Sequence, residues 1–270
     1  MVSVVELADV SVRRGHSLLL DGVDFAVEEG ERWVVIGPNG AGKTTLLSLL
    51  SAQTFPTQGM VGLLGEVMGA VDVFELRPRI GVSSSAIAER IPRGELVRDV
   101  VVSASYAVMG RWREAYDEMD FQRAAQLMDM FDLSGLADRT FGTLSEGERK
   151  RTEIARALMT DPELLLLDEP GAGLDLAGRE HLVATLSAMC LDDDAPAVVL
   201  VTHHVEEIPL GITHALLLNH GRVSAQGLVE EVLTDENLTA TFGLPLQVRR
   251  DDDGRWTAKA APVRSGQEGS

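Results

Sequence analysis

The sequence has a single cysteine and few basic residues. Cys190 is the only cysteine among 270 residues, so no disulfide can form within the chain, which fits a reducing compartment. Lysine and arginine number 24 against 42 aspartates and glutamates, a formal net charge of −18. Because proteins bind the nucleic acid backbone through clustered lysines and arginines, this shortage of positive charge argues against a nucleic-acid surface. We interpret the excess of acidic residues as a means of keeping the protein soluble.

Long hydrophobic runs are missing as well. The purely apolar runs, such as residues 164–167, have the length of a buried strand and fall short of the roughly 18 residues that cross a bilayer. The N-terminal residues lack a basic segment followed by a hydrophobic one, so we expect no secretion signal. These absences predict a cytoplasmic protein without direct membrane insertion. Its 270 residues are enough for one large domain or two small ones.

A glycine-rich loop between an apolar run and a helical pattern carries the strongest chemical signal. It follows residues 33–36 and matches G-x-x-x-x-G-K-[ST], in which glycines turn backbone N–H groups toward one point and form an anion nest. Lys43 would reach the β and γ phosphates of a nucleotide, Thr44 would bind Mg²⁺, and the dipole of the following helix favours the triphosphate. An ordinary turn before a helix is the alternative, which the long match disfavours. The loop consists of Gly37, Pro38, Asn39, Gly40, Ala41, Gly42, Lys43, Thr44 and Thr45.

A second signal is an apolar strand that ends in two carboxylates. The leucines at 164–167 are followed by Asp168 and Glu169. In a protein with a phosphate-binding loop, the carboxyl end of such a strand faces the triphosphate. Asp168 would then hold Mg²⁺ through water, and Glu169 would orient or deprotonate the attacking water. Without the loop, a solvated strand end would be the better interpretation.

The order of the strand and helix patterns predicts an α/β fold. Residues 2–35 alternate apolar and polar positions, as antiparallel strands do. Helical spacing over residues 95–109 and 114–131 predicts a helical insertion. Strands and helices alternate after it, which predicts a mostly parallel sheet covered on both faces. The later predicted elements are a helix from about 147, a strand at 163–168, a helix at 176–190, and strands at 197–201 and 215–218.

These patterns divide the chain into four parts. Residues 1–85 would form an antiparallel β subdomain and the first part of the core, and residues 86–144 an inserted helical subdomain. Residues 145–243 would complete the core, and residues 244–270 would form a C-terminal appendage with a disordered tail.

The segment Leu144-Ser145-Glu146-Gly147-Glu148 resembles the signature L-S-G-G-Q of the ATP-binding cassette (ABC) family. Ser145 and the N–H of Gly147, at the start of a helix, could bind a γ-phosphate. A simple capping box, in which Ser145 pairs with Glu148, is the alternative. The order of motifs favours the signature, because one helix separates it from the strand that ends at Asp168, as the family requires.

The resemblance covers residues 3–230 and includes two further motifs. Residues 173–175 are similar to the loop that, in the family, touches the opposite subunit, and His203 is similar to the switch histidine that contacts the γ-phosphate. His204 is adjacent, but the match favours His203. The family implies a RecA-like P-loop NTPase fold whose cassettes pair head to tail. Each ATP would then lie between Lys43 of one cassette and Ser145 and Gly147 of the other.

The resemblance also implies a function: Mg²⁺-dependent hydrolysis of ATP that powers an ABC transporter by closing a homodimer or a paired cassette. The cassette would lie on the cytoplasmic face of the membrane, bound to integral membrane permease subunits. The solitary cassette and the segment 242–245, which is similar to that of metal-chelate importers, favour import. Two alternatives stay open: a soluble, non-transport ABC ATPase acting on a ribosome or DNA-repair partner, and a nucleotide-binding regulator with low turnover.

Three features depart from the family pattern. Ser85 stands where a glutamine usually touches Mg²⁺ and water, and no glutamine occurs between Gln58 and Gln122. A serine could reach the metal there through an added water. Arg14 stands where an aromatic ring usually stacks on adenine; its guanidinium could stack as well, or it is an exposed arginine at a turn. The two glutamates of the signature replace Gly and Gln and add negative charge.

Overall fold

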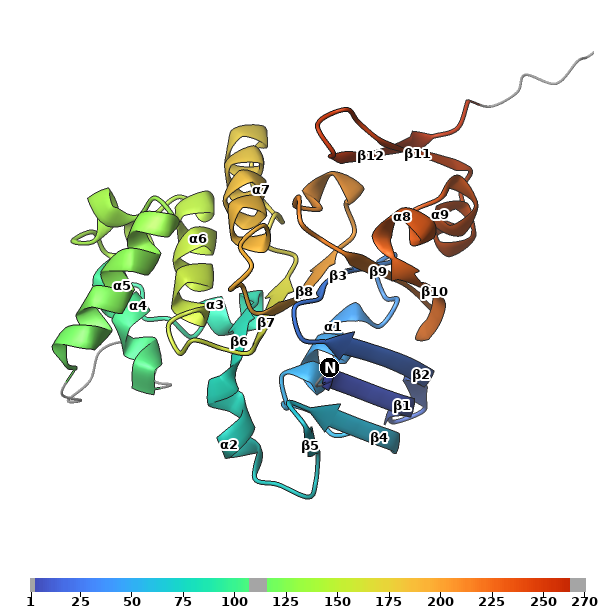
Figure 1. Ribbon diagram of the computed structural model, residues 1–270, viewed down its shortest axis with the longest axis horizontal. Coiled ribbons are helices and arrows are strands. Elements are labelled where there is room, and N and C mark those ends of the chain that lie inside the picture. The colour runs from blue at the N-terminus through green and yellow to red at the C-terminus, as the bar shows by residue number, and fades with distance from the viewer. Residues whose placement is uncertain (1–2, 107–115, 263–270) are drawn as a thin grey trace, which may run out of the picture.

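A six-stranded sheet forms the centre of the computed structural model, which describes residues 3–106 and 116–262. The strand order is β10-β9-β3-β8-β7-β6, with parallel pairing everywhere except between β9 and β10. This confirms the predicted α/β fold with a mostly parallel sheet (Figure 1). The strands are β3 (Arg32–Ile36), β6 (Ile80–Ser83), β7 (Leu164–Asp168), β8 (Ala197–Thr202), β9 (His214–Asn219) and β10 (Arg222–Leu228).

The central strands bury both faces, so successive side chains enter two different cores. Val34 and Ile36 of β3 belong to one core, together with residues of the helices between residues 97 and 242, while Trp33 and Val35 belong to the other. The second core also contains the leucines of α1 (Lys43–Leu50) and the apolar residues of the N-terminal strands. A strand covered on both faces has no polar side, which is why these segments read as continuous apolar runs in the sequence.

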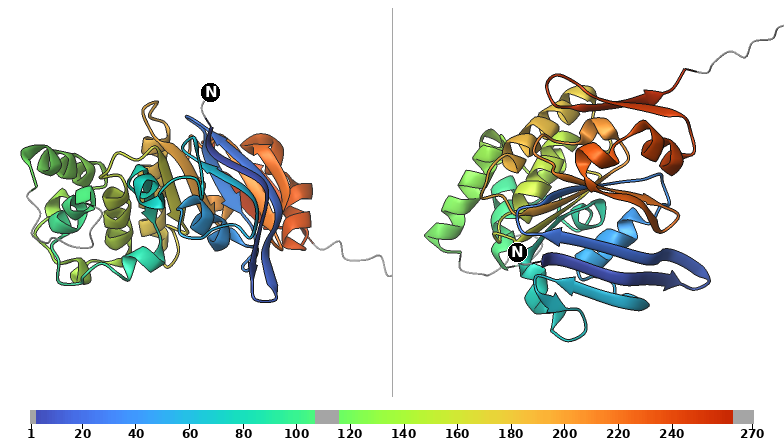
Figure 2. Two further views of the ribbon diagram at one scale, coloured as in Figure 1. Left: turned by 90° about the horizontal axis from the view of Figure 1, so that it is seen from below. Right: turned by 45° about the vertical axis from the view of Figure 1, so that its right-hand side comes forward.

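The N-terminal strands form an antiparallel sheet of order β2-β1-β4-β5, which packs as a separate layer with α1 between it and the central sheet (Figure 2). The predicted antiparallel pair is present as β1 and β2, but the sequence did not predict β4 and β5. At Gly59 in β4, an added Cβ would lie 2.3 Å from the carbonyl oxygen of Asp9 in β1. Only glycine allows so close an approach of two backbones. The strands are β1 (Ser3–Arg14), β2 (Ser17–Glu28), β4 (Gln58–Leu63) and β5 (Glu66–Val67).

The helical subdomain lies at the end of the molecule away from the antiparallel sheet, as the green helices in Figure 1 show. The helix expected at 95–109 is shorter in the structure, because α4 (Val97–Val102) gives way to a 3₁₀ turn at Ser103–Tyr106. The rest of that helix, and the first residues of the one expected at 114–131, lie outside the described residues. The other helices here are α3 (Ser85–Ala88), α5 (Glu118–Met130) and α6 (Glu146–Ala157). The short helix α2 (Val73–Leu76) lies apart from them, near β5 (Figure 1), and its Leu76 belongs to the core of the antiparallel sheet.

The C-terminal part adds a long helix, two short ones and a hairpin. The predicted helix at 176–190 is present with the same bounds as α7 (Leu176–Cys190), and α8 (Val229–Val232) and α9 (Asp235–Phe242) follow the last central strand. The expected appendage contains an antiparallel hairpin of β11 (Leu246–Arg250) and β12 (Trp256–Ala260), whose Trp256 is buried against the larger core. The end of the expected disordered tail, 263–270, lies outside the described residues. Within the described part of the chain, every helix is too short or too polar to span a membrane.

Candidate nucleotide-binding site

The phosphate loop, residues 37–45, joins β3 to α1, and its conformation depends on glycine at two positions. An added Cβ at Gly37 would lie 2.1 Å from the carbonyl oxygen of Leu218, and one at Gly42 would lie 2.7 Å from that of Leu19. Gly42 also has a φ of 109°, which other residues rarely adopt. The loop therefore packs directly against the backbones of β2 and β9, and no side chain could replace either glycine without moving a strand.

Lys43 is the first residue of α1 and is buried, with 6% of its surface exposed. Its Nζ donates to the carbonyl oxygens of Gly37 at 2.8 Å and Pro38 at 3.2 Å, and lies 3.7 Å from Oε1 of Glu169. Burial lowers the pKa of the Lys43 ammonium from its ordinary value, although the carboxylates of Glu169 and Asp168 act in the opposite direction. The ammonium is thus desolvated and held between the loop and the carboxylates, where a phosphate oxygen could bind it.

The two carboxylates at the end of β7 have different surroundings. Asp168 is the last residue of the strand, and burial and the neighbouring Glu169 raise its carboxyl pKa while Lys43 and Lys150 lower it. Glu169 adopts a left-handed backbone, with φ of 47°, and its N–H donates to the carbonyl oxygen of Val201 at 2.8 Å. A non-glycine residue in this region is strained by about 1–3 kcal/mol, and such residues are frequent at active sites.

Glu169 brings the lysine and the histidine together. Its Oε1 lies 3.1 Å from Nδ1 of His203, so one carboxylate contacts both Lys43 and His203. The rings of His203 and His204 are 4.0 Å apart, but it is His203 that faces the carboxylate. A base next to an imidazole can orient and deprotonate a water molecule.

The segment after β8 is fixed by a buried glutamate that the sequence did not indicate. Thr202 donates its hydroxyl to Oε2 of Glu207 at 2.5 Å and accepts a hydrogen bond from the N–H of His204 at 3.0 Å. Glu207 is only 5% exposed and fills the space beside Gly171, where an added Cβ would lie 2.5 Å from its Oε1. The loop carrying His203 therefore packs, through Glu207, against the chain that follows Glu169.

A surface hollow surrounds the phosphate loop and contains four residues that the sequence did not suggest. These are Leu18 and Leu19 from β2 and His220 and Gly221 from the turn after β9. The N–H of Gly221 donates to the carbonyl oxygen of Ala41 at 2.8 Å, so this turn supports the loop. A His-Gly turn next to a strand is visible in the sequence, but only the fold places it here. The remaining lining residues are Asn39, Gly40, Gly42, Lys43, Thr44, Thr45 and Glu169.

Arg14 and Ser85 do not line that hollow. Arg14 is exposed at the end of β1, where it pairs with Ser17 across the hairpin turn. Ser85 is exposed at the start of α3 and lines a different hollow, together with Lys150 and Glu153 of α6. The nucleotide contact of Arg14 and the metal contact of Ser85 stay predictions.

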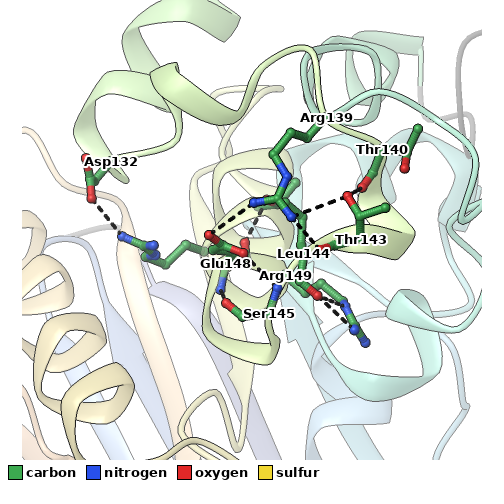
Figure 3. Close-up of polar contacts among 10 residues, drawn as sticks. Asp132, Arg139, Thr140, Thr143, Leu144, Ser145, Glu148 and Arg149 are labelled. Atoms are coloured by element: carbon green, nitrogen blue, oxygen red, sulfur yellow. Dashed lines mark hydrogen bonds and ion pairs between the residues drawn. The ribbon is translucent and has the colours of Figure 1, made fainter.

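The signature segment, residues 144–148, forms the capping box that the sequence offered as an alternative. The N–H of Ser145 donates to Oε2 of Glu148 at 2.7 Å, and the N–H of Glu148 donates to Oγ of Ser145 at 3.3 Å (Figure 3). In this box the Ser145 hydroxyl only accepts, so its hydrogen stays available for another acceptor. Capping of α6 and phosphate binding by Ser145 are therefore compatible.

Ser145 and Gly147 open onto a second hollow, which they share with Gly173, Leu174 and Asp175. In the described part of the chain, the residues lining this hollow and those lining the hollow at the phosphate loop do not overlap. The predicted site residues thus fall into two sets. In one set Glu169 contacts both Lys43 and His203, and the signature residues line the other hollow.

A divalent metal would find few protein ligands here. Among the described residues, no group of three or more His, Cys, Asp and Glu side chains could hold a metal ion. The hydroxyl of Thr44 and the partly buried carboxylate of Asp168 nevertheless fit Mg²⁺, which keeps several waters and is commonly held by one or two protein oxygens together with phosphates.

Similarity to known proteins places the chain in a family. The profile of the ABC transporter family matches residues 20–172. An uncharacterized ABC transporter ATP-binding protein of Bacillus subtilis is 39% identical over 96% of this chain and 98% of its own length. A hemin import ATP-binding protein of Nocardia farcinica is 37% identical over 87% of this chain and 81% of its own, and a Nod factor export ATP-binding protein of Cupriavidus metallidurans is 31% identical over 93% and 80%.

Solved structures agree with this assignment. The inward-facing conformation of a transporter described as metal-chelate type has a TM-score of 0.75 and 29% identity, covering 97% of this chain and 98% of the other. An ATP-binding cassette in a dimeric post-hydrolysis state with ADP and phosphate has a TM-score of 0.71 and 26% identity, covering 83% and 98%. The chain belongs to the ABC transporter family, as an ATP-binding subunit that hydrolyses ATP.

Proposed function

We propose that this chain powers the import of a metal chelate through a membrane permease, as one half of a cassette dimer on the cytoplasmic face of the membrane. The hemin import relative, at 37% identity, supports import, although Nod factor export relatives at 31–33% identity lie within the 29–37% range of the hemin import relatives. The metal-chelate transporter structure, which covers 97% of this chain, supports the substrate class.

The observation that carries the proposed mechanism is the separation of the two phosphate-binding sets. Lys43 contacts Glu169 directly, whereas Ser145 opens onto the hollow formed with residues 173–175. Two chains related by a two-fold axis would bring each phosphate loop opposite the signature segment of its partner. ATP would then join the two chains, and its hydrolysis would release them.

Each residue has a proposed role in that closed dimer. Lys43 and the loop N–H groups hold the triphosphate. Thr44 and Asp168 would hold Mg²⁺, which would neutralise charge between the β and γ phosphates. Glu169 orients and deprotonates the attacking water, and His203 holds the carboxylate and the γ-phosphate in line. Ser145 and the Gly147 N–H of the partner would close the site.

Replacing the base tests these roles. We expect Glu169→Gln to lower kcat for ATP hydrolysis about 10²- to 10⁴-fold, because the amide cannot accept a proton, while ATP binding is retained. The variant should therefore accumulate as an ATP-bound dimer, detectable by size-exclusion chromatography with light scattering. A wild type no more active than Glu169→Gln would instead support a low-turnover regulator.

The transport role is tested by identifying the partner. Tagged wild-type chain should co-purify from membranes of its own cells with an integral membrane protein. Recovery of a ribosomal or purely soluble partner would contradict the transport proposal and support a non-transport ATPase.

A further inference from the structure

The signature segment places two glutamates where, under the proposed function, a partner's γ-phosphate binds. Glu146 and Glu148 both lie in the first turn of α6 and line the same hollow as Ser145. A carboxylate close to a triphosphate repels it and also opposes the favourable dipole of the helix N-terminus. The segment therefore needs a source of compensating positive charge.

Arg139 supplies that charge to Glu148. Its Nη1 lies 3.8 Å from Oε1 of Glu148, and its Nη2 donates to the carbonyl oxygen of Thr143 at 2.6 Å. Figure 3 shows the Arg139 guanidinium extended between the two residues. The carbonyl thus fixes the guanidinium in front of the carboxylate. Burial raises the pKa of the Glu148 carboxyl, but the hydrogen bonds with Ser145 and the charges of Arg139 and Arg151 outweigh it and hold that pKa below its ordinary value.

Arg149 pairs with Glu146 as Arg139 pairs with Glu148. Its Nη1 lies 3.3 Å from Oε2 of Glu146, and its Nε and Nη2 donate to the carbonyl oxygen of Leu144 at 3.0 and 2.9 Å. Each arginine therefore makes two kinds of contact: one with a backbone carbonyl one or two residues before Ser145, and one with a carboxylate one or three residues after it. Figure 3 shows the Arg149 contact with Leu144.

These two pairs have little to do with the stability of the fold. The side chains of Arg139 and Glu146 are 45% and 48% exposed, and those of their partners Glu148 and Arg149 are 22% and 32% exposed. Ion pairs that water reaches in this way contribute little to folding. Their position at the start of α6 means that their charge acts mainly on an approaching anion.

We propose that Arg139 and Arg149 are positioning residues of the phosphate site, which neutralise Glu148 and Glu146 so that the partner's γ-phosphate can approach Ser145. The proposal rests on the proposed dimer mechanism. It makes the acidic signature of this chain dependent on two arginines that lie outside the signature itself.

The test uses ATP-driven dimerisation in the Glu169→Gln background. We expect Arg139→Ala to raise the ATP concentration for half-maximal dimerisation about fivefold, because Glu148 is then left negative beside the phosphate. Arg139→Lys should keep most of the wild-type response. Binding of a fluorescent ATP analogue to the monomer should not change, because Lys43 is untouched.

A second substitution separates charge from structure. Glu148→Gln keeps an acceptor for the Ser145 N–H, since glutamine also completes a capping box. In the double variant Arg139→Ala/Glu148→Gln, half-maximal dimerisation should return to within about twofold of the parent. A merely structural Arg139 would not be rescued, since its bond to the Thr143 carbonyl is lost in both variants.

The control is Arg98→Ala, which removes a similarly exposed arginine that pairs with Asp138 in the same subdomain. It should leave dimerisation unchanged, and thermal unfolding should show that all variants are folded. An unaffected Arg139→Ala, or a double variant as weak as the single one, would overturn this inference alone. A Glu169→Gln parent that fails to dimerise with ATP would instead overturn the proposed function.

Discussion

The buried ion pair of Lys150 and Glu153 is the clearest feature at the scale of residues that the sequence does not predict. Both lie on α6, with 6% and 4% of their surfaces exposed, and Nζ of Lys150 lies 3.6 Å from Oε2 of Glu153. Burial raises the pKa of the Glu153 carboxyl to about 7, although the Lys150 charge opposes this shift. The two residues look like ordinary members of a charged helix, and only the packing of α6 buries them.

This shift predicts how stability depends on pH. Because the pKa of Glu153 is raised from 4.5 to about 7 in the folded state, the folded chain binds this proton over a pH range in which the unfolded chain has lost it. The free energy of unfolding should therefore fall as pH rises from about 4.5 to 7, by at most about 3 kcal/mol from this group. Glu153→Gln removes this dependence.

Chemical denaturation of wild type and Glu153→Gln at several pH values measures it. The difference between their unfolding free energies should change over this pH window and level off above it. A difference that is constant from pH 4.5 to 8 would contradict the raised pKa of Glu153.

At the scale of elements, the C-terminal hairpin is connected to the segment that carries His203. Arg255, in the hairpin turn, donates to the carbonyl oxygen of Glu206 at 2.7 Å and pairs with Glu180 of α7 at 3.1 Å. The N–H of Ala258 in β12 donates to the Glu206 carboxylate at 3.2 Å. The hairpin thus joins the chain after His203 to the helix after the 173–175 loop.

We therefore expect Arg255→Ala to loosen the position of His203. It should lower kcat for ATP hydrolysis about three- to tenfold, since small displacements of a positioned group reduce the rate, with little change in KM because the phosphate loop is intact. Arg249→Ala, which removes an exposed arginine of the same hairpin, is the control. An unchanged kcat for Arg255→Ala at full folding would show that the hairpin does not act on the site.

The elements predicted best from the sequence are those fixed by local pattern. The helix α7 has the predicted bounds because Asp175 caps it, accepting from the N–H of Gly178 at 2.7 Å. The strands β7 and β8 are apolar except for their last residues, Asp168 and Thr202, and begin and end within one residue of the prediction. By contrast, three of the six residues of β4 are exposed and two are glycines, and the segment is a strand because it pairs with the distant β1. Local propensity cannot reveal such pairing.

The residues of the candidate site were likewise predicted best where a local motif defines them. Lys43, Glu169 and His203 belong to short motifs with fixed spacing, and the structure brings them into contact. Glu207 and the turn at Gly221 have no motif, because their places depend on how separate strands end beside each other. The predicted nucleotide contacts of Arg14 and Ser85 rest on single positions of the resemblance, and the structure places both outside the hollow around the phosphate loop.

At the scale of the whole molecule, the proposed mechanism assigns one part of a phosphate site to each of two separate hollows. One hollow contains the phosphate loop with Lys43 and Glu169, and the other contains the signature segment with Asp175. A head-to-tail dimer would complete both at once, and two-fold symmetry makes the two composite sites identical. The central claim is therefore that ATP binds between Lys43 of one chain and Ser145 of its partner.

Mixing two defective variants tests this claim most directly. In the Glu169→Gln background, Lys43→Ala removes the ammonium, and Ser145→Asp keeps a good helix cap while adding a negative charge against the γ-phosphate. Neither variant alone should retain labelled ATP after rapid filtration. An equal mixture should retain up to about a quarter of the ATP held by the parent, because half the dimers are mixed and each has one intact composite site. A mixture that retains no more ATP than the separate variants would contradict a site shared between two chains.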